Sequence, residues 1–345
     1  MSQDHLDREV AVFGELTERG IKGGAKSRAI SSIDRLLGSA VDVLSAPLEG
    51  VARRERARQD AQVALIAALG EQQLQQLHDS PDFAEQALKQ HLKITVRREE
   101  NKKETVRLAI EDLQSTPPSD DQSNAGSDEL DPDFLNRFER YAEDATSEQL
   151  RERWGRVLAS EIRSPGTFSG KVMRVVDELD ASTAAAFERL CAHRIGDAIP
   201  KILAGKLSFS EATQLVNADL ILDPDGGHIR LSVQSTLTDG AQIWLLKFED
   251  MALSLPIAAG VALPYTDEIR ALSSHQNKPV VPVYLLTPAG RAIASILPSE
   301  VAQSMRILTR SVSTELPDDY VHEFRQTSEN NFSVVATFVA GQQSS

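Results

Sequence analysis

Hydrophobic residues recur at every third or fourth position through much of the first 195 residues. This spacing places them on one face of an α-helix. The first such helix is predicted from residue 29, and Pro47 is expected to end or kink it, because proline lacks the backbone N–H that a helix needs. Its apolar face, with polar residues opposite, includes Ile30, Ile33, Leu37, Val41 and Leu44.

Two more helical runs are predicted, over 48–77 and from Pro81 onward, since proline is favoured at the first position of a helix. The second run contains the wholly polar stretch 97–105, where the helix either continues through solvent or turns. Glu99 and Lys103 lie four residues apart, a spacing at which opposite charges stabilise a helix. This pair favours continuation.

A change of composition marks the expected boundary between domains. Residues 117–133 contain six acidic residues, no basic residue and no aromatic residue. Such a segment buries too little apolar surface to offset the entropy lost on ordering. We therefore expect a flexible start over 1–28, a helical amphipathic region over 29–116 and an acidic linker over 117–132.

The most regular helical pattern follows this linker, over residues 133–200. Thr146 and Gln149 have the spacing of a capping box that opens a helix, and Asp180 is expected to cap another. The Ser164–Gly166 turn should stop the helix between them. Short helices with short connections pack as an antiparallel bundle.

Alternating polar and apolar residues replace the helical pattern after residue 200. Such alternation is typical of strands, and Pro282 should confine its strand to a sheet edge or distort it. Strands are expected over 228–234, 243–248 and 280–286, with a final pair near the C-terminus. We therefore predict a mainly α protein: N-terminal amphipathic helices and a central helical bundle, followed by a small α+β domain over 201–345. A winged-helix-like arrangement of that domain is the alternative.

Three runs in the central region carry a family resemblance: DPDFLNRFERYAEDATSEQLRERWGRVLASEI, then SPGTFS, then VVDELDASTAAAFERLC. In this order they resemble a bacterial family designated domain of unknown function 2806, best over residues 129–195. The resemblance implies that Trp154 and Ser164–Gly166 define the fold, and it assigns no catalytic residue. It also implies an association with antiphage defence, because some members of such families belong to defence systems.

Charge and composition narrow the classes of function. Lys and Arg total 37 against 51 Asp and Glu, a net charge of −14, which argues against a general polyanion binder. The single cysteine, Cys191, excludes a disulfide framework. The longest uncharged apolar stretch, 252–266, contains prolines and is too short to span a bilayer. We expect a cytoplasmic protein without a secretion signal, and the alternative is attachment to the inner face of a membrane.

Candidate chemistry is sparse. Residues 20–27 nearly match a phosphate-binding loop, but Ala25 replaces a required glycine and no βαβ pattern surrounds it. Cys191 and His193 could form a dyad, yet residues two apart on a helix face different directions. No histidine pair has metal-ligand spacing. We expect no catalytic, cofactor-binding or metal-binding residue and no cofactor.

The most unusual surface is the segment 29–58, where the apolar stripe precedes four clustered arginines. The stripe either packs against other helices, which is the more common arrangement, or enters an anionic membrane surface, or contacts a partner protein or a second copy. The arginines are Arg53, Arg54, Arg56 and Arg58.

The resulting hypothesis is a non-enzymatic interaction or sensor protein, a component of an antiphage system by resemblance, that docks on a partner protein or membrane through its N-terminal helices. One alternative is a nucleic-acid-binding regulator that uses the C-terminal domain, although basic residues there are scattered among acids. Another is an enzyme whose site is assembled from residues distant in the sequence.

Overall fold

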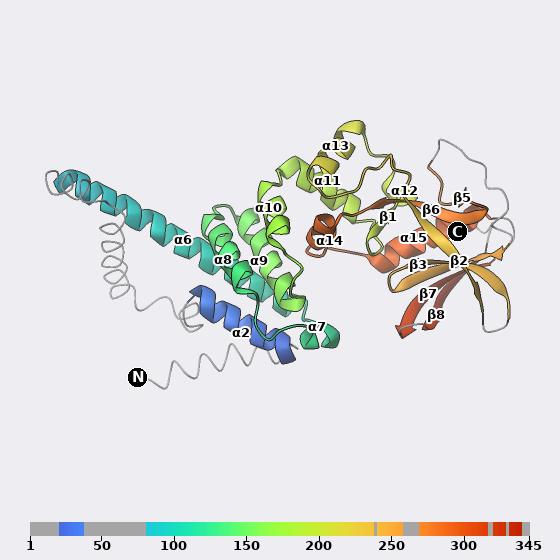
Figure 1. The fold of residues 1–345 in the computed structure, drawn as a ribbon, viewed down its shortest axis with the longest axis horizontal. Helices are drawn as coiled ribbons and strands as arrows, with labels where there is room; N and C mark the ends of the chain where they lie inside the picture. The colour runs from blue at the N-terminus through green and yellow to red at the C-terminus, as the bar shows by residue number, and fades with distance from the viewer. Residues whose placement is uncertain are drawn as a thin grey trace. The chain divides into compact units, whose positions relative to one another are not determined.

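The computed structural model describes residues 21–37, 81–237, 240–257, 269–316, 320–328 and 331–339. Its internal contacts divide the chain into two units, Met1–Met173 and Arg174–Ser345. The described part of the first unit is helical, whereas the second unit contains a large β-sheet (Figure 1). No described helix combines the length and the apolar character that a membrane crossing requires.

The described helices of the first unit follow the predicted periodicity. One long helix continues through the polar stretch 97–105 without a break. Gly155 allows this helix and its neighbour to approach closely, because a Cβ at position 155 would stand 3.1 Å from the carbonyl oxygen of Thr105. The helices are α2 (Gly23–Leu37), α6 (Pro81–Ser115), α7 (Asp120–Asn124), α8 (Pro132–Asp144) and α9 (Glu148–Arg163), and α10 (Gly170–Glu178) spans the division.

Aromatic residues form the centre of the bundle. Trp154 is buried on α9, with the ring of Tyr141 stacked on it at 4.5 Å and Phe138 edge-on at 6.3 Å. The next turn is held by the buried carboxylate of Glu161, which accepts hydrogen bonds from the N–H groups of Gly166 (2.5 Å) and Phe168 (2.9 Å). This carboxylate connects the end of α9 to the turn that was expected to stop it.

The acidic segment 117–132, expected to be a linker, lies inside the first unit and includes α7. Arg28 orders it. This fully buried side chain donates to the carbonyl oxygens of Gln122 (2.8 Å), Ala125 (2.9 Å) and Ser127 (2.9 Å), and also to that of Ile162 on α9 (2.7 Å). The helix that carries Arg28 begins at Gly23, within the stretch expected to be flexible.

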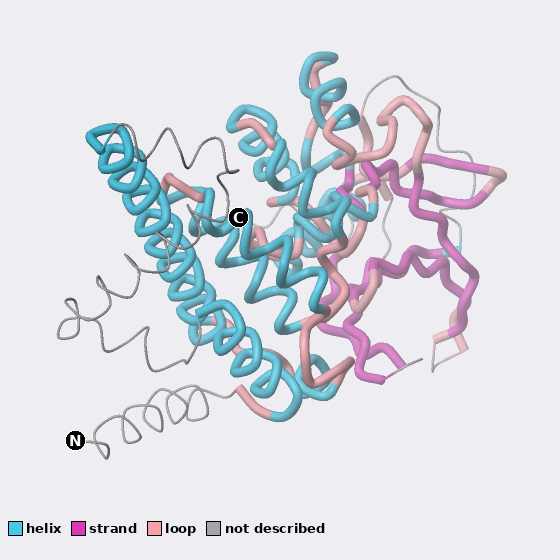
Figure 2. The backbone as a smooth tube through the Cα atoms, turned by 60° about the vertical axis from the view of Figure 1, so that its left-hand side comes forward, coloured by secondary structure: helices cyan, strands magenta, loops and turns pink. Residues whose placement is uncertain are grey.

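The second unit contains one eight-stranded antiparallel sheet in the order β1-β6-β2-β3-β4-β7-β8, with β5 also paired to β6. The sheet is strongly curled (Figure 2). Its strands are β1 (Ala198–Pro200), β2 (Ile229–Thr236), β3 (Gln242–Phe248), β4 (Met251–Pro256), β5 (Ser273–His275), β6 (Lys278–Leu285), β7 (Tyr320–Ser328) and β8 (Asn331–Val339). The helices of this unit are α11 (Ala181–Cys191), α12 (Lys201–Ala204), α13 (Phe209–Asn217), α14 (Pro288–Ala294) and α15 (Val301–Thr314).

The predicted fold class, mainly α with a small α+β C-terminal domain, is therefore wrong. A large curled sheet replaces the small α+β domain and its winged-helix alternative. The five predicted strands lie close to β2, β3, β6, β7 and β8, whereas β1, β4 and β5 were not predicted. β1 pairs with β6 across a long stretch of chain, and local patterns do not reveal such pairings. Apolar side chains on one face of the sheet pack with α15 through Met305, Leu308 and Val312.

Pro282 was expected to confine its strand to a sheet edge or to distort it, and the edge position is wrong, because β6 pairs on both sides. The N–H of Val283 donates to His228 on the β2 side. Neighbouring residues in a strand direct their backbone groups to opposite sides, so the nitrogen of Pro282 faces the other side. There, β5 pairs with 278–280 and β1 with 283–285. Pro282 falls between these two short strands, where no ladder hydrogen bond is lost.

Candidate functional site

The structure places three of the nine predicted contact residues on α2. Ile33 is buried, and Ile30 and Leu37 are partly exposed. Contacts of α2 with α6, α7, α8 and α9 cover this side of the helix, so Ile33 belongs to the core of the first unit. The remaining six, Val41, Leu44, Arg53, Arg54, Arg56 and Arg58, lie outside the described residues.

The weaker chemical candidates form no site in the described structure. The glycine pair of the near-match phosphate loop starts α2. Cys191 is fully buried, and this burial raises the pKa of its thiol to about 12, so the thiol stays protonated at neutral pH. Among the described residues, no group of three or more His, Cys, Asp or Glu side chains could hold a metal ion.

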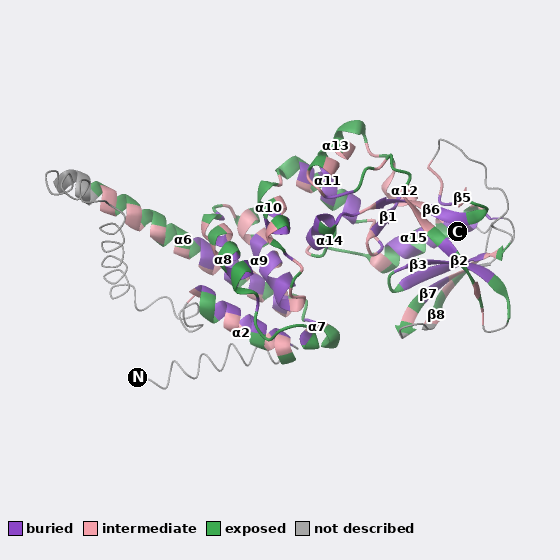
Figure 3. Cartoon of the chain, viewed as in Figure 1, coloured by how far each residue is buried: buried purple, intermediate pink, exposed green. Residues whose placement is uncertain are grey.

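Residues 86–100 of α6, here called the α6 arm, form the first candidate surface. Beyond residue 100 the helix is covered by α8 and α9, with Val106, Ala109 and Leu113 fully buried. Within the arm no residue is buried (Figure 3). Ile94 is 37% exposed and Val96 46% exposed. In this one continuous helix, the apolar side chains after residue 100 are therefore buried in the core, and those of the α6 arm reach solvent.

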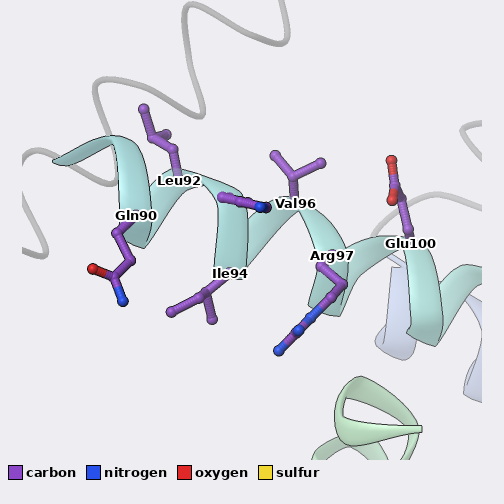
Figure 4. Close-up of a pocket in the computed structure, with 7 residues that line it drawn as sticks. Gln90, Leu92, Ile94, Val96, Arg97 and Glu100 are labelled. Carbon is purple, nitrogen blue, oxygen red and sulfur yellow. The ribbon is translucent and has the colours of Figure 1, made fainter. Parts of the chain in front are cut away.

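Apolar side chains of the arm lie on two sides of the helix. Leu92 and Val96 point to the same side in Figure 4, and Ile94 points to the opposite side. This agrees with helix geometry, in which residues four apart share a face and residues two apart lie about 200° apart. Leu88 precedes Leu92 by four residues, so Leu88, Leu92 and Val96 form one stripe.

Basic residues lie beside this stripe. Lys93 and Arg97 line the same hollow as Leu92 and Val96, and neither has an ion-pair partner among the described residues. Charges at the base of the arm are paired: Lys102 contacts Glu99 (3.1 Å) and Glu139 (2.9 Å). Burial alone would lower the pKa of Lys102, but the hydrogen bonds to these two carboxylates outweigh burial and raise it.

A cleft of about 310 Å³ in the second unit is the second candidate, here called the polar cleft. Its apolar wall comes from the C-terminal end of β6 and from α14 and α15, and its charged side chains come from three different segments. The lining residues are Arg194, Gly196, Glu249, Asp250, Leu286, Arg291, Ala294, Ser295, Ser299 and Val301.

Ion pairs organise the charges of the polar cleft. The Asp197 carboxylate lies 2.5 Å from Arg230 and 3.8 Å from Arg291. Arg194 donates to the carbonyl oxygens of Leu297 and Pro298, at 3.1 Å each. Burial lowers the pKa of Arg194, without removing its charge at neutral pH, since arginine titrates far above this range.

Glu249 reaches the cleft from the two-residue turn between β3 and β4. Its φ is +52°, a value that few non-glycine residues adopt. The side chain lies across Gly196, where a Cβ would stand 2.5 Å from Glu249 Cδ. Partial burial raises the pKa of Glu249, Asp197 and Asp250 raise it further, and Arg230 and Arg291 oppose them.

Sequence reasoning missed both surfaces. The helical period predicted α6, but the same period continues through its covered and uncovered halves, so it does not show where coverage ends. The polar cleft joins residues around 194, 249, 291 and 299, which no local motif connects. The only signal was the acidic pair Glu249–Asp250 directly after the predicted strand 243–248, and acidic residues are common in turns.

The described elements define a two-unit protein, one unit helical and one built on a curled antiparallel sheet, with an uncovered helical arm and a polar cleft. Residues 93–309 match the family model described as "Protein of unknown function (DUF2806)", and the chain belongs to this family. This confirms the resemblance seen in the sequence. Searches of the curated proteins and of the solved structures found no match.

Proposed function

We propose that this protein is a non-enzymatic interaction protein that docks a partner protein through the α6 arm. The supporting observation is the change in coverage along α6, where apolar side chains are buried after residue 100 and reach solvent before it. Burying exposed apolar surface on a partner is favourable by about 25 cal/mol per Å². A partner would therefore gain stabilisation where the bundle provides none.

The spacing and charge of the arm specify the kind of partner. Leu88, Leu92 and Val96 recur at four-residue intervals, as do the anchors of a helix that packs into a groove or onto a second helix. Lys93 and Arg97 lie beside them. A partner helix with an acidic flank would pair with these cations, whereas a second copy of the arm would place like charges near each other.

The same geometry favours a protein over a bilayer as the surface that the arm contacts. An interfacial helix needs its apolar residues on one face, but Ile94 and Val96 point to opposite sides (Figure 4). Membrane docking through segment 29–58 stays a separate proposal that depends on Arg53, Arg54, Arg56 and Arg58. Flotation with anionic liposomes, comparing the full chain with Arg54→Glu, would test it: equal binding would contradict it.

A role in antiphage defence is part of this proposal only through the family resemblance. The structural prediction is narrower: if the protein acts in such a system, replacing Val96 by aspartate should abolish protection from phage infection without reducing the amount of protein. Plaque counts with matched protein levels would measure this. Unchanged protection from infection would show that the α6 arm has no part in antiphage defence.

Site-specific photo-crosslinking in cells that naturally make the protein tests the docking proposal. A photoreactive residue at position 96 should give one crosslinked product of defined mass. The matched control is position 307 on α15, since Ile307 is 44% exposed and Val96 46%. Leu92→Asp should remove the product at position 96. Equal products at both positions, or none at position 96, would contradict the proposal.

A further inference from the structure

The charges of the polar cleft point to a ligand. We propose that the polar cleft binds a small zwitterion, with its anionic group at Arg291 and its cationic group at Glu249. This inference does not depend on the α6 arm, because every residue of the cleft lies in the second unit. If the protein acts as a sensor, this zwitterion would be the ligand that it detects.

Arg291 is the arginine of the cleft whose N–H donors are available to a ligand. Arg194 uses its two terminal nitrogens on the carbonyl oxygens of Leu297 and Pro298. Arg230 is held at 2.5 Å by Asp197. Among the described residues, Arg291 has only the 3.8 Å ion pair with Asp197, and its side chain is 52% exposed. A guanidinium carries five N–H donors in a planar fork that matches a carboxylate.

Glu249 is the complementary acceptor. Among the described residues, no hydrogen bond or ion pair ends on its carboxylate. Asp250, in contrast, has an ion pair with Arg325 at 3.8 Å. The missing side chain at Gly196 gives this carboxylate its space, because a Cβ there would stand 2.5 Å from Glu249 Cδ. The positive φ of Glu249 is the one that a two-residue hairpin turn requires.

The size and charge balance of the cleft restrict the ligand. A volume of about 310 Å³ lies at the small end of ligand sites. The two arginines in the lining of the cleft (194 and 291) are balanced by two carboxylates (249 and 250), so a ligand with a net charge gains little. A molecule that carries both an ammonium and a carboxylate, such as an amino acid or a dipeptide, can contact Glu249 and Arg291 at once.

Isothermal titration calorimetry of the full chain tests this ligand class. The probes are the standard L-amino acids and glycylglycine, with acetate and methylammonium as single-charge controls. At least one zwitterion should bind, and neither acetate nor methylammonium should bind comparably. Glu249→Gln and Arg291→Gln should each weaken binding about tenfold or more, as expected for the loss of one charged hydrogen bond.

Arg189→Gln is the matched control, because Arg189 forms an ion pair with Glu211 (2.9 Å) in the same unit and neither residue lines the cleft. It should leave the affinity unchanged. Gly196→Ala should also weaken binding, since the added methyl group displaces Glu249. Circular dichroism would show that each variant is folded. Binding of acetate as tightly as any zwitterion, no binding of any zwitterion, or equal weakening by Arg189→Gln would overturn the proposal.

Discussion

The two units of this protein are stabilised in different ways. In the first, a buried charged side chain, Arg28, joins segments far apart in the sequence by donating to backbone carbonyl oxygens. In the second, strand pairing and an apolar core around Met305 and Leu308 hold the structure, and the buried carboxylate of Glu323 has an oxygen, Oε2, without a hydrogen-bond partner. The buried charge of Arg28 therefore stabilises the first unit, whereas the buried carboxylate of Glu323 lowers the stability of the second.

The largest effect is expected for Arg28→Met. This change leaves four carbonyl oxygens without their donor, and breaking a buried charged network costs roughly 3–5 kcal/mol. Denaturant unfolding with hydrogen exchange should show the loss in peptides of the first unit. The control is Arg35→Met, because Arg35 lies on the same helix and makes exposed hydrogen bonds. Equal losses for the two variants would contradict the role given to Arg28.

Gly290→Ala should give the next largest effect, in the second unit. A Cβ at position 290 would stand 1.9 Å from the carbonyl oxygen of Leu220, so α14 and the chain before β2 must separate. Such overpacking costs about 3 kcal/mol. Thermal unfolding would measure it. Ala289→Gly, which removes a methyl group from the same helix, should cost only about 1 kcal/mol. If Gly290→Ala destabilises the protein no more than Ala289→Gly, the close approach of residue 290 to Leu220 is contradicted.

Glu323→Gln should stabilise the second unit at alkaline pH. Burial raises the pKa of Glu323 above its ordinary value of 4.5, and Arg306 opposes this shift. The folded protein therefore keeps a proton that the unfolded chain loses, so stability is complete below pH 4.5 and falls as pH rises through the raised pKa. At pH 8 the variant should gain about 1–3 kcal/mol, the cost of an unsatisfied buried group.

Unfolding measured from pH 4 to 8 would show this gain as a flatter pH profile. Glu188→Gln is the control, since Glu188 is exposed on α11 in the same unit. If the wild-type profile is flat, or if Glu188→Gln flattens it equally, Glu323 is not the group that loses stability with pH.

The smallest effect concerns the start of α9. Sequence spacing predicted Thr146 as the cap, but the oxygen of Ser147 accepts from the N–H of Leu150 at 3.2 Å. Ser147→Ala should therefore cost about 1 kcal/mol, and Thr146→Ala should cost clearly less. Thermal unfolding of the two variants decides between the two positions, and the reverse order would restore the predicted capping box.

Local physics made most helices and strands predictable. The starts of α6 and α11 follow from Pro81 and Asp180, because prolines and caps act within a few residues. The face of β2 was not predictable. Alternation predicted a strand over 228–234, but the structure exposes its apolar residues Leu231 and Val233 and buries Ser232.

Contacts between distant segments were the least predictable. The order of the sheet depends on pairings that no short window contains, such as β1 with β6. The buried state of Arg28 depends on carbonyl groups about a hundred residues away, so the sequence around Arg28 does not predict it. Neither candidate surface could be predicted from the sequence for the same reason. The coverage of α6 and the assembly of the polar cleft arise only when distant elements pack.

Hydrogen exchange of the α6 arm tests the central claim most directly. The measurement compares the protein purified alone with the complex isolated from cells that naturally make it. We predict that amides of residues 86–100 exchange faster than those of 101–113 in the free protein and become protected in the complex, while peptides of α15 do not change. Equal exchange of residues 86–100 in the two samples would contradict the claim that this half of α6 docks a partner.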